Sequence, residues 1–135
     1  MRKSYVFFLG VILLCIAGRV YFLFNKPHTG TANIRANVSI NAEDLYIKYQ
    51  NNEAKANTLY LDKVLEVKGV VSAVSVKGPI VNIQLNASTA GGINCNLFPV
   101  NPKDRQLPAI GSVLTIKGRC TGYLMDVNLV DCVIE

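Results

Sequence analysis

The sequence predicts a mainly β protein, in which a short helical segment and an N-terminal transmembrane helix precede a small five-stranded barrel. Three observations lead to this fold class: one long apolar run at residues 5–24, apolar residues at helical spacing over 41–60, and β-branched segments separated by turn residues over 64–134. The 135 residues therefore divide into a cytoplasmic tail at 1–4, an anchor at 5–24, a linker at 25–40 and one domain at 41–135.

The apolar run at residues 5–24 is long enough to cross a bilayer. Twenty helical residues extend about 30 Å, which matches the hydrocarbon core. Arg2 and Lys3 precede the run, and Arg19 lies close enough to its far end to reach the headgroups with its long side chain. The basic tail favours the cytoplasmic side. We therefore expect a single-pass protein with its N-terminus inside and its domain outside the cytoplasm, which is the periplasm in a Gram-negative cell.

Three other interpretations of this run compete with an uncleaved anchor. A cleaved signal peptide needs small residues before the cut, and Ala17-Gly18-Arg19 meets this need poorly. A lipoprotein signal needs a small residue before its cysteine, whereas the large Leu14 precedes Cys15. The third alternative is a helix of a soluble core. An uncleaved anchor is favoured over all three.

The formal charge of +5 is concentrated at the membrane end. Residues 1–26 carry four basic side chains and no acidic one, so the rest of the chain has 10 basic against 9 acidic residues. Nucleic-acid binding requires concentrated positive charge that displaces counterions from phosphates. The charge distribution therefore disfavours nucleic acid as a partner.

A polar linker and a broken helix precede the β segments. Residues 25–40 lack helical periodicity and are predicted to be a flexible linker. Asn41 can cap a helix whose first turn holds Glu43 and Asp44, where acidic groups oppose the helix dipole. The polar triplet at 50–52 predicts a break between two helical turns. The expected apolar stripe consists of Leu45, Tyr46, Tyr49, Ala56, Leu59 and Tyr60.

Five strands follow. The first, at residues 64–76, is long and β-branched, with Gly69 where a strand bulges or bends. The others are expected at 80–85, 93–98, 113–120 and 127–134, with a proline-containing connector at 99–111. Five strands of this size, the first one long and bent, predict an OB-fold barrel, whose closure removes exposed strand edges. An SH3-like barrel or a small sandwich is the alternative.

Several segments of the chain resemble a known family. They are Tyr49–Asn57, Tyr60–Gly69, Gly92–Cys95, Gly118–Val127 and Leu129–Cys132, and the last two blocks are the most specific. Together they span about residues 41–134 and resemble the tRNA_anti-like family. The resemblance implies an OB fold and an N-terminal export or anchor segment. It implies no particular activity, because the family name records similarity to anticodon-binding OB domains.

No catalytic, cofactor or metal site is predicted. The only histidine, His28, lies in the linker, away from any serine or cysteine of the domain. The acidic residues Glu66, Asp126 and Asp131 are interpreted as loop and surface charges rather than an acid/base pair. The domain has no Cys-x-x-Cys pair and no phosphate-binding glycine motif. We therefore expect a protein that is not an enzyme.

The predicted ligand contacts are Phe98 and Tyr123. OB domains bind ligands chiefly on their second and third strands, and here those strands offer Phe98 as their one aromatic residue and no lysine or arginine. Tyr123 falls in the loop between the last two strands. We expect a binding or interaction module for an envelope protein, peptide or glycan. The alternatives are a nucleic-acid-binding OB protein and a structural accessory subunit of a membrane complex.

The domain contains three cysteines. In an oxidising compartment two of Cys95, Cys120 and Cys132 could form a disulfide, and the alternative is that all three are buried thiols. Strands three and five are neighbours in an OB barrel. Pairing of Cys95 with Cys132 is therefore at least as plausible as pairing of Cys120 with Cys132.

Overall fold

The computed structural model describes residues 2–24, 31–97 and 106–135, with side chains described only for 10–21 of the N-terminal helix. That helix, α1, runs from Arg2 to Phe24 and contains the predicted span at 5–24. Within the described residues, no helix meets the length and apolarity needed for a membrane crossing.

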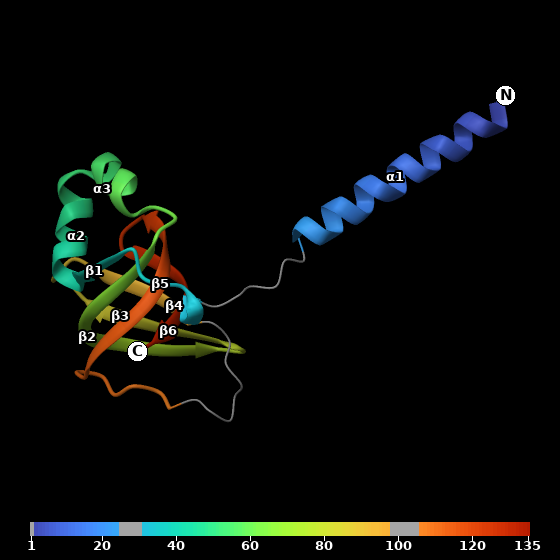
Figure 1. Cartoon of the computed structure of the whole chain (residues 1–135). Coiled ribbons are helices and arrows are strands. Elements are labelled where there is room, and N and C mark those ends of the chain that lie inside the picture. Colours follow the sequence, from blue (N-terminus) through green and yellow to red (C-terminus); the bar gives the residue numbers. More distant parts are fainter. Residues whose placement is uncertain (1, 25–30, 98–105) are drawn as a thin grey trace.

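The domain begins with short helical segments and one short strand, and five further strands follow (Figure 1). The helical elements are the 3-10 helix η1 (Thr31–Asn33) and the α-helices α2 (Ala42–Asn51) and α3 (Glu53–Tyr60). The strands are β1 (Val38–Asn41), β2 (Val64–Lys77), β3 (Ile80–Asn86), β4 (Gly92–Leu97), β5 (Val113–Tyr123) and β6 (Val127–Ile134). The helix break predicted at 50–52 is confirmed, because Asn52 ends α2 and caps α3.

Five of the strands close into a barrel, which confirms the barrel and the preceding helical segment of the predicted fold class but not its transmembrane helix. The sheet order is β1-β2-β3-β4-β6-β5, and an additional β2–β5 pairing joins the two sides. All barrel pairings are antiparallel except β4–β6, which is parallel. This is the OB arrangement, in which the third and fifth barrel strands lie side by side.

The first barrel strand serves both sides of the closure. β2 pairs with β5 from Val64 to Val70 and with β3 from Val70 to Lys77. The irregularity in its pairing lies between Val71 and Ala73, two residues beyond the predicted bend at Gly69. Gly69 has another role: a Cβ there would lie 2.9 Å from Cβ of Ala42, so the glycine lets α2 approach the strand.

The inward faces of the barrel strands and one face of the helices form a single core. All three domain cysteines belong to it, as do the tyrosines at 46, 49 and 60. Leu59 does not, since 43% of its surface is exposed, and the predicted apolar stripe is wrong at this position. Helix α3 presents Ala56 and Tyr60, which lie one turn apart, to the core, and Leu59 lies on its exposed side.

Residues 31–40 are not a linker, which corrects the sequence-based prediction for this part of 25–40. Thr31 is fully buried, and its hydroxyl lies 3.0 Å from the carbonyl oxygen of Lys117 and 2.8 Å from that of Asp131. Strand β1 pairs in parallel with the start of β2, from Val38 opposite Leu65 onward. A strand of four residues is too short to show the alternation of apolar and polar residues in the sequence. Only its pairing with β2 identifies β1 as a strand. Residues 25–30 lie outside the described residues.

Replacement of Thr31 by valine tests whether this segment belongs to the domain. Thr31→Val keeps the shape of the side chain but removes the hydroxyl, so we expect the free energy of unfolding to fall by about 1 to 2 kcal/mol. Thr31→Ser, which keeps the hydroxyl, is the matched control, and its free energy of unfolding should fall by less. Chemical denaturation of both variants measures the difference, and equal stability of Thr31→Val and the original protein would contradict the assignment.

Candidate functional site

The outer face of β3, β4 and β6 carries a row of amide side chains. This amide face consists of Asn82, Gln84, Asn94, Asn96 and Asn128, all of which are half-buried. They point outward because the residues between them, such as Ile83 and Cys95, fill the core. The second and third barrel strands are the usual ligand-binding strands of OB folds, so the amide face lies where a ligand is expected.

Hydrogen bonds join these amides across three strands. The side-chain amide of Asn82 donates to the side-chain oxygens (Oδ1) of Asn94 and Asn96, the latter at 2.8 Å. The side-chain amide of Asn94 in turn donates to the side-chain oxygen (Oδ1) of Asn128 at 3.2 Å. Each amide has two donor hydrogens and an oxygen with two lone pairs, so these bonds leave further donors and acceptors for a ligand. The face is thus pre-arranged and uncharged.

Asp126 fixes one end of the amide face. Its carboxylate accepts a hydrogen bond from the backbone N–H of Gly92 at 2.7 Å and one from the Gln84 amide at 3.5 Å. A Cβ on Gly91 would lie 2.9 Å from the same carboxylate and 2.6 Å from the hydroxyl of Tyr46. The β5–β6 turn is therefore held against the start of β4, and a glycine is needed at the point of contact.

The strands of this face carry no cation. Neither β3, β4 nor β6 contains a lysine or arginine, and the carboxylate of Asp126 lies at one end of the face. Phosphate binding depends on lysine and arginine side chains that neutralise the backbone charge. The chemistry of the face is that of neutral hydrogen bonding.

Tyr123 lies elsewhere than the sequence analysis expected. It is the last residue of β5 rather than part of a loop, and it is half-buried. Its ring stacks on Tyr49 at 5.7 Å and meets the edge of Tyr46 at 5.9 Å. A hydrogen bond with the Tyr46 side chain raises the pKa of Tyr123. Its role as a ligand contact stays a prediction, and Phe98 lies outside the described residues.

The three domain cysteines are free thiols in the barrel interior. Cys120 lies 3.3 Å from the hydroxyl of Tyr49. The pKa of Cys132 is raised well above its usual range. The main cause is a hydrogen bond with Cys95, and burial of the thiol is the second cause. A Cβ on Gly118 would overlap the sulfur of Cys132, so the barrel accommodates this thiol through a glycine. Cys95 and Cys132, which contact each other, are one of the pairs that the sequence analysis considered for a disulfide. The disulfide itself stays a prediction.

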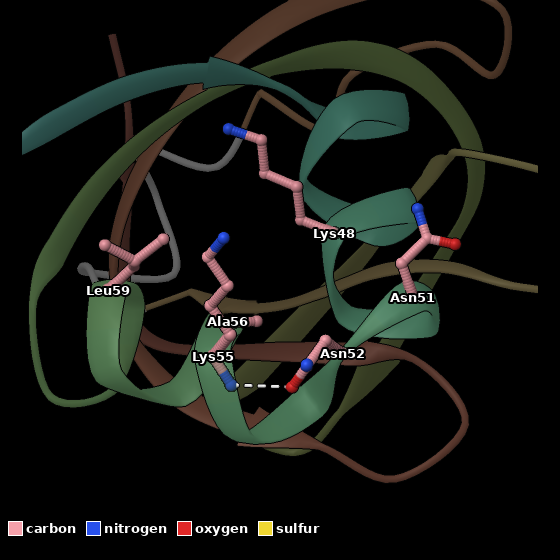
Figure 2. A pocket seen from close by; sticks show the side chains of 6 residues that line it. All are labelled: Lys48, Asn51, Asn52, Lys55, Ala56 and Leu59. Atoms are coloured by element: carbon pink, nitrogen blue, oxygen red, sulfur yellow. Dashed lines mark hydrogen bonds between the residues drawn. The ribbon is translucent and has the colours of Figure 1, made fainter.

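A second candidate region is a hollow of about 430 Å³ between α2 and α3 (Figure 2). Its lining includes Lys48, Lys55 and Leu59, and the two lysine ends point to the same side of the helical pair. The Lys48 ammonium donates a hydrogen bond to the hydroxyl of Tyr60 at 3.0 Å, which raises the pKa of Lys48. The hollow thus offers positive charge, which the amide face lacks.

Sequence reasoning recovered the strands of the amide face but missed its residues. The alternation at Asn82, Gln84, Asn94 and Asn96 was the available signal, since polar residues on one side of paired strands must share a surface. Asn128 and Asp126 join them only through the parallel β4–β6 pairing.

Comparisons with known proteins agree with this fold. The model of the family described as tRNA_anti-like matches residues 1–134. Among solved structures, the chain is similar to a Klebsiella pneumoniae protein described as a "putative nucleic acid-binding lipoprotein", with 21% identity and a TM-score of 0.57. The likeness covers 71% of this chain and 90% of that one. No curated protein matches the chain.

The cysteine arrangement leads to a prediction about thiol reactivity. The raised pKa of Cys132 lowers its thiolate fraction at neutral pH, and only the thiolate is alkylated. Together with burial, this should keep Cys132 in the folded protein largely unmodified by iodoacetamide, whereas the denatured protein reacts readily. Mass spectrometry of the two samples, with and without reductant, counts the free thiols. Rapid labelling of Cys132 in the folded state would contradict the structure, and three free thiols in the exported protein would end the disulfide interpretation.

Proposed function

Because this chain belongs to the tRNA_anti-like family, we propose that it is a membrane-anchored binding module whose OB barrel captures an extended peptide segment of an envelope protein outside the cytoplasm. The observation that carries the proposal is the amide face: hydrogen-bonded amides on three adjacent strands, with no lysine or arginine among them.

A peptide suits this face because it repeats the same chemistry. Each peptide group offers one N–H and one C=O, and a side-chain amide complements both. Ile80 precedes the amides on the same side of β3 and is 47% exposed, so an apolar side chain of the peptide has a contact there. The nearby carboxylate of Asp126 does not repel a neutral ligand, whereas it would repel a negatively charged phosphate.

The anchoring part of the proposal rests on the N-terminal segment. Residues 5–24 combine an apolar run with two preceding basic residues, and α1 spans 23 residues as a continuous helix. We assign the barrel no catalytic step, because the only histidine is outside the domain and no nucleophile–base pair is evident in its sequence.

Photo-crosslinking in native membranes tests the peptide proposal. A photoreactive amino acid at Asn96, on the amide face, should give an adduct that protease digests and nuclease leaves intact. The same group at Ser39, on β1 and exposed, is the control and should give none. Adding Asn82→Leu to the Asn96 variant should reduce the adduct, because Asn82 links the amides. Equal adducts at Asn96 and Ser39, or a nuclease-sensitive adduct, would contradict capture of a peptide.

Nucleic-acid binding is the second candidate, since the Klebsiella protein is described in those terms. Single strands bind OB domains through basic grooves and stacked aromatic rings. With no cation on the amide face, we expect the full-length protein in detergent to leave single-stranded DNA and RNA unshifted in gels, even at low salt. A shift that disappears as salt rises would favour this candidate over the peptide.

A further inference from the structure

One end of the barrel bears exposed apolar side chains from two separate elements. Leu124 and Met125, in the β5–β6 turn, are 84% and 78% exposed, and Leu59 and Leu61, at the end of α3, are 43% and 38% exposed. The two elements are adjacent, because a Cβ on Gly122 of β5 would lie 3.6 Å from the Leu61 side chain. Figure 1 shows α3 and the β5–β6 turn at the same end of the barrel.

Both signs of charge lie beside these apolar residues: Asp62 and Asp126 directly follow Leu61 and Met125, and two lysines lie beside Leu59. Lys48 and Lys55 line the hollow between α2 and α3 together with Leu59 (Figure 2). The Lys48 ammonium is held 5.7 Å from the centre of the Tyr60 ring. Within the described part of the chain, neither lysine has a carboxylate partner at ion-pair distance. The nearest acidic residues along the helices are Asp44, one turn before Lys48, and Glu53, at the start of α3.

We propose that this end of the barrel docks onto an anionic lipid bilayer, with Leu124 and Met125 inserted among the headgroups and a lipid phosphate in the hollow between Lys48 and Lys55. A bilayer surface matches both features. Its interface takes up exposed leucine and methionine side chains, and its phosphates attract lysines. We call Leu59, Leu61, Leu124, Met125, Lys48 and Lys55 the docking end.

The docking end and the amide face are chemically distinct and adjoin at the β5–β6 turn, where Asp126 follows Met125 and accepts hydrogen bonds from Gly92 and Gln84. The inference rests on the proposed function only in that the anchor brings the barrel near a bilayer. It does not depend on what the amide face binds.

The chain contains no tryptophan, so a single introduced one reports on its own surroundings. We would place it at Leu124, and in a separate control variant at Ser75 in the other half of the barrel. Both full-length variants would be mixed with phosphatidylglycerol-containing vesicles whose acyl chains are brominated. We expect the fluorescence of Leu124→Trp to fall by about twofold, with a blue shift, and that of Ser75→Trp to remain unchanged.

Charge substitutions test the hollow. In the Leu124→Trp background, Lys48→Gln with Lys55→Gln should weaken the quenching, as should neutral phosphatidylcholine vesicles. Lys68→Gln with Lys77→Gln removes the same charge from exposed positions on β2 and should have little effect. Circular dichroism of each variant confirms folding. Equal effects of the two lysine pairs would overturn the role of the hollow.

Flotation of the same samples separates this inference from the proposed anchoring. Protein that floats with the vesicles while Leu124→Trp stays unquenched would overturn docking and leave the anchor intact. Protein that neither floats nor shows quenching would overturn both. Equal quenching of Leu124→Trp and Ser75→Trp would overturn docking at this particular end.

Discussion

The structure depends on the double pairing of strand β2. Its first half binds β5 and its second half binds β3, so one 14-residue strand closes the barrel. Such a strand must bend, and the pairing irregularity beyond Val71 supplies the bend. The start of β2 also pairs in parallel with β1. Gly69 of β2 lets helix α2 pack closely against the strand. Without this closure the barrel would be an open sheet whose edge strands could pair with other chains.

Closure also creates the candidate site. Because β5 returns to β2, β6 is forced into the space beside β4, where the pairing is parallel. This contact places Asn128 next to Asn94 and brings Asp126 to the N–H of Gly92. On the inner side, the same two strands bring the thiols of Cys95 and Cys132 together. One strand pairing thus sets both the outer polar surface and the inner sulfur contact.

Three regions of the molecule differ in their charge. The N-terminal segment holds most of the net positive charge, the amide face is neutral beside a carboxylate, and the helical pair carries Lys48 and Lys55 around a hollow. The overall basicity therefore says little about what the barrel strands bind. Recognition on the amide face depends on hydrogen bonds, because its strands β3, β4 and β6 carry no lysine or arginine.

The sequence by itself determined the elements that have a clear period. The five barrel strands, the helix break at Asn52, the barrel fold class and the absence of cations from the second and third strands were all readable, because alternation and turn residues act locally. Only the tertiary structure revealed β1, the burial of Thr31, the packing of Tyr123 against α2 and the outward turn of Leu59. Each of these depends on a partner distant in the sequence, and a local pattern carries no information about such a partner.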